Sequence, residues 1–230
     1  MDIMFVLVEP ARGENIGAAA RAIKTMGFKQ LRLVRPGDMT AAQWVAHQSN
    51  EVLEQARTFD SLGDALSDVD LSIACTARRR LQKDRYVDAD QCAELIAAKG
   101  DSVQRVAIVF GREASGLTGD EVALCDLASS IPLAQEQPSL NLAQAVMVYA
   151  WELRKQPLPP TVSSNPDTTT YQHTRDAMRG LLAALEVGPE ENLHQWLDEL
   201  LPLAGERELG LVRQLLRRLQ RLDKLARSPE

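Results

Sequence analysis

The first two-thirds of the chain alternates short apolar runs with segments of helical periodicity, and this alternation is what most limits the fold. Runs typical of strands occupy residues 4–9, 31–34, 71–75, 106–110 and 129–133. Helical patterns lie between them, at residues 16–26, 41–57 and 61–67. Strands that alternate with helices predict an α/β fold built on a parallel sheet.

The composition changes after Lys155. Residues 156–170 contain four Pro and many Ser and Thr, which is typical of an extended linker. Helical patterns return at residues 171–185, at 190–200 and from Leu209 onward. We therefore expect three parts: an α/β domain at residues 1–156, a linker at 157–170 and an all-helical extension at 171–230. The last helix carries arginines opposite its apolar stripe, which indicates either a solvated surface or an RNA contact.

The overall composition excludes several classes of protein. A net charge of −6 argues against an unspecific polyanion binder but allows a local basic patch. The three Cys and three His show no metal-ligand spacing, so we expect no metal and reduced thiols. Residues 1–10 resemble a strand rather than a signal peptide, and no run is long enough for a membrane span. These features predict a soluble, cytoplasmic protein.

A loop with two glycines follows the first predicted strand, at residues 9–17. Asn15 is placed to cap the next helix, and Gly27 to end it. Arg21 lies one to two turns into that helix, where its guanidinium can reach back over the loop. It could hold a phosphate or lie against a hydroxyl that must lose its proton, but an ordinary salt bridge is the alternative.

Two further loops follow predicted strands. Gly111 comes directly after a strand, where open α/β sheets bind ligands, and Arg112 and Glu113 add a charge pair that could also be a plain surface ion pair. The basic run that begins at Arg78 could contact RNA phosphates or simply keep the loop soluble. Dinucleotide-binding, P-loop and nucleophile-elbow motifs are absent from the sequence.

Taken together, three segments resemble the motifs of the SpoU (TrmH-like) branch of the SPOUT RNA methyltransferases. They are residues 9–27, 110–118 and 139–145, in the order and spacing of that family. The residues that carry the resemblance are Asn15, Ile16, Gly17 and Arg21, then Phe110, Gly111, Arg112, Glu113, Gly116 and Leu117, and finally Ser139, Leu140, Asn141, Leu142 and Ala143. Each motif is weak alone, and the set is specific.

The resemblance implies a parallel sheet with helices on both faces and a C-terminal deep trefoil knot, an exception to the rule against knots. It also implies a homodimer in which Arg21 enters the partner's site and the apolar face of the helix at residues 142–153 is buried between subunits. S-adenosylmethionine would be the methyl donor, with no metal. Its expected contacts are Cys75, Thr76, Ala77, Gly111, Ile131, Pro138, Ser139 and Leu140.

The implied reaction is methylation of a ribose 2′-hydroxyl. A free arginine is a poor base, so we expect Arg21 to position the nucleophile and stabilise the developing alkoxide. The implied catalytic residues are Arg21, Asn15, Glu113, Ser139 and Asn141. The residues expected to bind RNA are Arg12, Arg78, Arg79, Arg80, Lys83 and Arg112.

Residues 20–27 and the helical extension look most like family members that act on tRNA, at nucleotide 32 (C or U) of the anticodon loop. Ribosomal RNA is the nearest alternative substrate. A non-catalytic RNA-binding protein of the same fold is another possibility, and a metabolite-binding α/β protein is mildly favoured by the negative charge.

Overall fold

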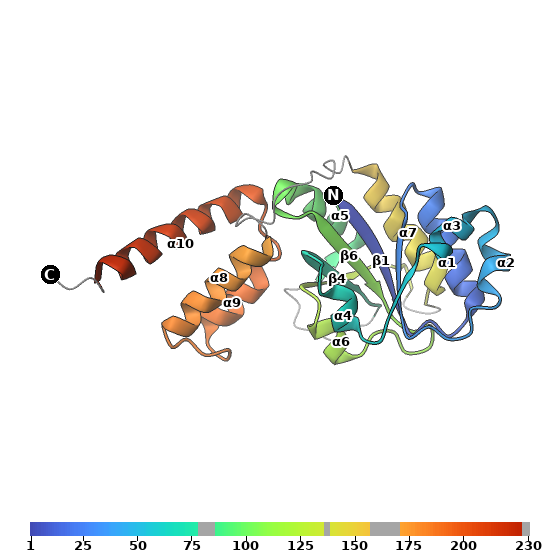
Figure 1. Cartoon of the computed structure of the whole chain (residues 1–230), viewed down its shortest axis with the longest axis horizontal. Helices are drawn as coiled ribbons and strands as arrows, with labels where there is room; N and C mark the ends of the chain where they lie inside the picture. The colour runs from blue at the N-terminus through green and yellow to red at the C-terminus, as the bar shows by residue number, and fades with distance from the viewer. Residues whose placement is uncertain (78–85, 136–138, 157–170, 227–230) are drawn as a thin grey trace.

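The computed structural model describes residues 1–77, 86–135, 139–156 and 171–226, with side chains up to residue 220. Parallel strands form one seven-stranded sheet in the order β3-β2-β1-β6-β4-β7-β5 (Figure 1). The strands are β1 (Asp2–Val8), β2 (Gln30–Val34), β3 (Arg57–Phe59), β4 (Leu71–Cys75), β5 (Tyr86–Asp88), β6 (Arg105–Phe110) and β7 (Leu127–Ser130). The predicted α/β fold with a parallel sheet is confirmed.

Helices cover both faces of the sheet. In the described residues they are α1 (Gly13–Thr25), α2 (Ala42–Ala46), η1 (His47–Ser49), α3 (Asn50–Glu54), α4 (Leu62–Leu66), α5 (Ala89–Ala98), η3 (Gly100–Ser102), α6 (Gly119–Ala123), α7 (Leu142–Lys155), α8 (Tyr171–Ala184), α9 (Asn192–Leu200) and α10 (Glu206–Ala226).

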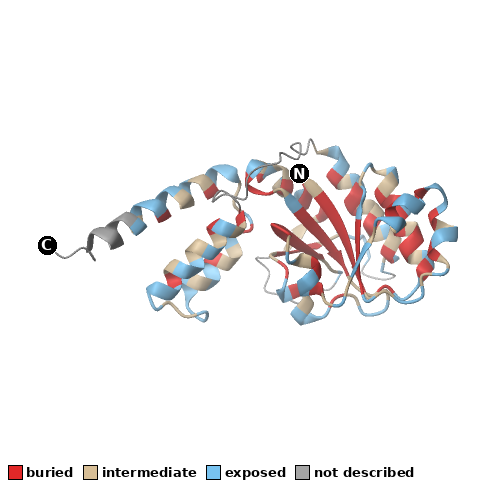
Figure 2. Cartoon of the chain, in the orientation of Figure 1, coloured by how far each residue is buried: buried red, intermediate tan, exposed pale blue. Residues whose placement is uncertain are grey.

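Alternate residues of β1 pack into two separate hydrophobic cores, because successive side chains of a strand point to opposite faces of the sheet. Ile3, Phe5 and Leu7 pack with buried residues of α1, α5 and α7, whereas Met4 and Val6 pack with those of α4 and α6. The central strands are accordingly buried along their length, as Figure 2 shows in red. Burial on both faces explains why these strands read as continuous apolar runs.

Two predicted elements need correction, and two strands were not predicted. The helix expected over residues 41–57 is broken into α2, η1 and α3, because His47 leaves the helical conformation with φ 49°. Its last residue, Arg57, begins the edge strand β3 instead. The strand expected at residues 129–133 lies at Leu127–Ser130. The edge strands β3 and β5 are each three residues long, too short to show a periodicity.

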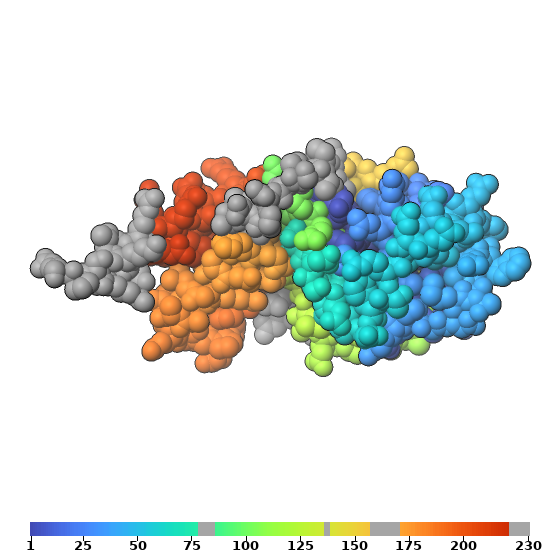
Figure 3. Space-filling model, in the orientation of Figure 1, coloured from blue at the N-terminus to red at the C-terminus, as the bar shows by residue number. Residues whose placement is uncertain are grey.

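The C-terminal helices pack against the α/β domain. Lys99, which is fully buried, donates Nζ–H to the carbonyls of Pro202 and Ala204, both at 2.5 Å. Arg175 of α8 pairs with Asp126, and Gln172 donates to the Asp70 carbonyl. The space-filling view shows these helices seated against the α/β domain (Figure 3), and the ribbon of α10 runs outward from it (Figure 1). The division at residues 157–170 stays a prediction, because that linker lies outside the described residues.

Candidate active site

Three neighbouring strands end at the same level of the sheet. Cys75, the last residue of β4, is in register with Phe110 of β6 and Ser129 of β7. The Thr76 amide, just beyond β4, donates to the Ser129 carbonyl at 2.9 Å. The loops that contain Thr76, Gly111 and Ile131 therefore start side by side, at the edge where open parallel sheets bind ligands.

The loop after β6 folds tightly on itself at Gly111. A β carbon at this position would lie 2.2 Å from the Gly116 carbonyl carbon and 2.2 Å from the Leu117 nitrogen. Arg112 and Gly116 exchange two backbone hydrogen bonds across the loop, and Gly116 has φ +70°. Glycine is required at 111 for the close approach and favoured at 116 by the positive φ.

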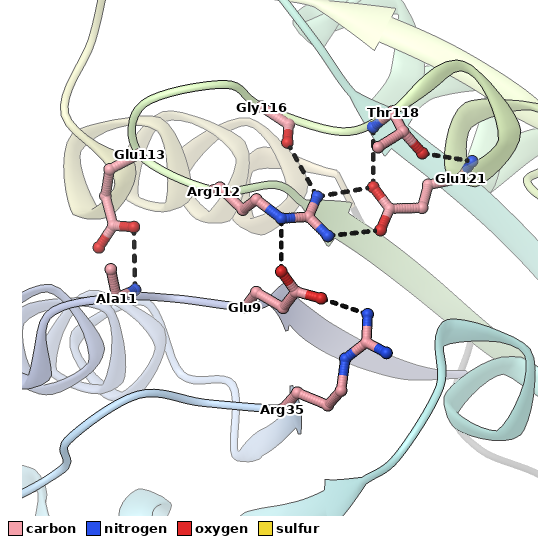
Figure 4. Close-up of polar contacts among 8 residues, drawn as sticks. All are labelled: Glu9, Ala11, Arg35, Arg112, Glu113, Gly116, Thr118 and Glu121. Atoms are coloured by element: carbon pink, nitrogen blue, oxygen red, sulfur yellow. Dashed lines mark hydrogen bonds and ion pairs between the residues drawn. The ribbon is translucent and has the colours of Figure 1, made fainter.

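The side chain of Arg112 ties this loop to neighbouring segments by hydrogen bonds. Its guanidinium donates to Glu9, to both carboxylate oxygens of Glu121 and to the Gly116 carbonyl (Figure 4). The hydrogen bonds that Arg112 donates to Glu121 and Glu9 raise its pKa further above the ordinary value. The expected charge pair between Arg112 and Glu113 is not formed, because the two side chains have different partners. With its guanidinium bound internally, Arg112 has less support as an RNA contact.

Asn15, Glu113 and Asn141 join the three motifs. The Asn15 amide donates Nδ2–H to Glu113 Oε1 at 2.8 Å and accepts at Oδ1 from Asn141 Nδ2 at 2.9 Å. Glu113 also accepts from the backbone amides of Ala11 and Arg12. Burial alone would raise the pKa of the Glu113 carboxyl, but these hydrogen bonds together lower it. The cluster therefore carries a negative charge at neutral pH.

The caps of the adjoining helices differ from the prediction. Asn15 is not the N-cap of α1, because that helix already begins at Gly13 with Arg12 in the cap position. Asn141 is the N-cap of α7, where its Oδ1 accepts from the Ala143 amide at 2.8 Å. Asn141 thus fixes the start of α7 and binds Asn15 with the other end of the same side chain. Ser139 lies two residues earlier and is exposed.

This arrangement matches a known family. Residues 2–151 fit the model of the SpoU rRNA methylase family. The chain belongs to the SpoU rRNA methylase family. The resemblance of the three segments is confirmed at the level of the family.

Relatives of the SpoU chain cover almost its whole length. It is 40% identical over 227 residues to LasT of Escherichia coli strain K12, an uncharacterized tRNA/rRNA methyltransferase, covering 96% of this chain and 98% of LasT. It is 33% identical over 228 residues to the tRNA (cytidine/uridine-2′-O-)-methyltransferase TrmJ of Citrobacter koseri, covering 98% and 89%. A probable methylase family protein from Haemophilus influenzae Rd KW20 superposes with a TM-score of 0.65 at 32% identity, covering 98% of each chain.

The other expected site residues of this SpoU chain lie on α1 and in the loops at the carboxyl ends of the strands. Arg21 is exposed on α1, six residues after Asn15, a rise of about 9 Å. It makes no hydrogen bond or ion pair with the described part of the chain, and Arg12 is also exposed. Ala77 and Ser139 are exposed at this edge, and Leu140 is half-buried. Arg78, Arg79, Arg80, Lys83 and Pro138 lie outside the described residues.

The partners of Arg112, Glu9 and Glu121, were not predicted from the sequence. Thr118 and Glu121 form a capping box at the start of α6, and their T-x-x-E spacing could have predicted that helix start from the sequence. Glu9 has no such signal, because its role depends on a partner 103 positions away. Burial raises the pKa of the Cys75 thiol, so this residue is a neutral side chain rather than a nucleophile. Over the described residues, no group of His, Cys, Asp and Glu could hold a metal ion.

Proposed function

We propose that this protein transfers a methyl group from S-adenosylmethionine to a ribose 2′-hydroxyl of tRNA, most specifically at nucleotide 32 of the anticodon loop. The observation that carries the proposal is the Asn15–Glu113–Asn141 cluster, which joins the three family motifs beside the carboxyl ends of β4, β6 and β7. The reaction named for the C. koseri relative supports the substrate class.

The residues at this edge fit S-adenosylmethionine. Ile131 and Leu140 keep part of their apolar surface exposed, and the loops after β4 and β6 contribute Ala77 and Gly111, which have little or no side chain. Small residues and partly exposed apolar side chains at the carboxyl ends of parallel strands suit a ligand with an apolar adenine face and polar edges. When bound, the sulfonium would supply an electrophilic methyl group and its own leaving group.

The chain's own residues would prepare the ribose for attack. Arg21 has no partner in the described part of its own subunit, so its guanidinium is free to stabilise the oxygen that gains negative charge as the 2′-hydroxyl loses its proton. Asn15 and Asn141 are held in fixed orientations by their hydrogen bonds, and Glu113 keeps the first loop against the second. Such preorganisation favours the transition state because no groups must reorient during the reaction.

A homodimer is part of the proposal, with one correction. The apolar face of α7, which we expected between subunits, is buried in its own subunit: Val146, Tyr149 and Leu153 belong to the core under the sheet. A partner would instead meet the opposite side of α7, where Trp151 is exposed and Met147 is partly buried. The family resemblance supports the dimer and the arrival of Arg21 from the partner subunit.

The trefoil knot and the cellular location are also proposals. The family resemblance supports a knot formed by the chain between β7 and α7. The described helices lack the length and apolar composition that a bilayer crossing requires. Cys75, Cys92 and Cys125 are free thiols, which fits the reducing cytoplasm.

The test is methyl transfer from labelled S-adenosylmethionine to unmodified tRNA transcripts, followed by mapping of the modified nucleotide. We expect a 2′-O-methyl group at nucleotide 32 that disappears with Arg21→Ala. The matched control is Arg57→Ala, which changes an exposed arginine on the distant edge strand β3. Donor binding without transfer to any RNA would contradict catalysis and leave an RNA-binding protein.

Ribosomal RNA is the second candidate substrate, because the LasT relative is named for tRNA and rRNA together. Ribosomal RNA fragments belong in the same assay. Transfer to a ribosomal fragment with none to tRNA would move the proposal to that substrate.

A further inference from the structure

The turn after α2 holds a histidine in a strained conformation. His47 has φ 49° and ψ −122°, and Gln48 has φ −75° and ψ 17°. These angles match the two central positions of a type II′ turn, whose first position is normally glycine. A side chain there costs stability, and such strain is retained mainly at functional sites.

His47 is held beside Arg21 by close helix packing. Gly13, Gly17 and Arg21 are spaced four residues apart, so they share one face of α1. A β carbon on Gly17 would lie 2.2 Å from the Ala42 carbonyl oxygen, so the two helices touch through backbone at this point. The next residue on that face, Arg21, then faces the turn after α2.

A hollow of 560 Å³ lies between the two segments, lined by Arg21, Lys24, Thr25 and residues 46–49. Its two cations differ in their partners. Lys24 donates to the Gln48 carbonyl at 2.5 Å and pairs with Glu51 at 3.2 Å, so its charge is balanced and it holds the turn. Arg21 has no partner among the residues described, and its charge is available to an anion.

An exposed aromatic residue lies on α2, shortly before the turn that lines this hollow. Trp44 is 81% exposed and lies one turn before His47 and Gln48, on the short helix α2 at the outer edge of the molecule (Figure 1). A tryptophan is rarely left so exposed without a partner. Aromatic side chains beside cations are the usual way in which proteins hold single-stranded nucleic acid, since every base can stack.

We propose that Arg21, His47 and Trp44 form a subsite for the RNA nucleotide that adjoins the methylated one. Its phosphate lies against Arg21 and His47, and its base stacks on Trp44. The inference rests on the proposed function. The net charge of −6 is a further reason to expect RNA at a few local cationic points rather than over a broad basic surface.

Two variants of the full chain test the subsite. His47→Gly is expected to raise the melting temperature, because glycine relieves the strained turn, and also to weaken binding of unmodified tRNA. Trp44→Ala is expected to weaken binding about tenfold and to remove the photo-crosslink to 5-iodouridine-substituted RNA, with donor affinity unchanged. Trp196→Ala is the control, because Trp196 is 52% exposed on α9 outside the subsite.

The outcomes separate this inference from the proposed function. If the wild type transfers methyl groups while both variants bind RNA as it does, the subsite is wrong and the function stands. If both variants weaken the dimer but leave RNA affinity per dimer unchanged, this surface is a contact between copies and the subsite is again wrong. If the wild type transfers no methyl group, the proposed function itself has failed.

Discussion

Asn15 and Glu113, 98 positions apart in the sequence, share a hydrogen bond of 2.8 Å from Nδ2 to Oε1. The same Asn15 amide accepts from Asn141 at its other end. Because the donor and the acceptor of one amide both have partners, its orientation is fixed and no other side chain of the same size can replace it. This contact couples the start of α1 to the loop after β6 and to the start of α7.

We predict that Asn15→Asp disrupts the site while keeping its shape. The new carboxylate cannot donate to Glu113, and the two negative charges would repel each other and raise the pKa of Glu113. Unfolding by denaturant should show a loss of about 1–3 kcal/mol, and methyl transfer should fall below detection. Asn50→Asp, on the exposed first turn of α3, is the control. Wild-type stability and activity in Asn15→Asp would refute this role.

Lys99 should give the protein a distinct pH dependence. Burial lowers the pKa of Lys99 to about 7, against 10.5 for an ordinary lysine. Above pH 7 the folded chain releases this proton while the unfolded chain keeps it, so the free energy of unfolding should rise with pH from about 7 upward. Below pH 7 both states carry the proton and this contribution is constant.

The measurement for Lys99 is denaturant unfolding between pH 6 and 8.5, in the wild type and in Lys99→Met. The variant should lack the rise and be less stable throughout, because the carbonyls of Pro202 and Ala204 lose their donor. The range ends below pH 9 because burial also raises the pKa of Cys92, to about 12, which reverses the trend at higher pH. Lys29→Met, at an exposed lysine, should keep the rise. The same slope in Lys99→Met would show that another group causes it.

The ion pair between Arg175 and Asp126 should stabilise the attachment of α8. The two side chains meet at 2.6 Å, and Asp126 also accepts from the amide and hydroxyl of Ser72. Arg175→Ala leaves this carboxylate buried without its cation, so we expect a loss of about 2 kcal/mol or more and faster amide exchange in α8. Arg179→Ala removes an ion pair whose arginine is 45% exposed and should cost less than about 1 kcal/mol. Equal losses for the two variants would contradict this distinction.

Gly17 should not accept even a methyl group. Gly17→Ala would force α2 away from α1 because the added carbon has no room beside the Ala42 carbonyl, and we expect a loss of roughly 1–3 kcal/mol in denaturant unfolding. Gly180→Ala is the counterpart in the middle of α8, where nothing lies within 4 Å of the added carbon. There alanine should stabilise the protein by about 0.5–1 kcal/mol. The free energy of unfolding should therefore fall in Gly17→Ala and rise in Gly180→Ala.

The sequence predicted the central strands well because burial on both faces leaves an uninterrupted apolar run in each of them. It missed β3 and β5, which have three residues each and no pattern of their own. Asn15 was predicted as a helix cap because an asparagine before an apolar run usually is one. Its actual partners, Glu113 and Asn141, are set by the tertiary fold. The pairing of Arg112 with Glu9 and Glu121 was invisible for the same reason.

The C-terminal helices are attached at the amino ends of the sheet strands, whereas the candidate site lies at their carboxyl ends. Gln172 binds the carbonyls of Val69 and Asp70 just before β4, Arg175 binds Asp126 just before β7, and Lys99 lies shortly before β6. The site is at the other end of these strands, and the six residues of β6 span about 20 Å. Any molecule that touches both the extension and the reacting centre of one subunit must reach across that length. A folded RNA is long enough to span this distance, whereas a free nucleoside is not.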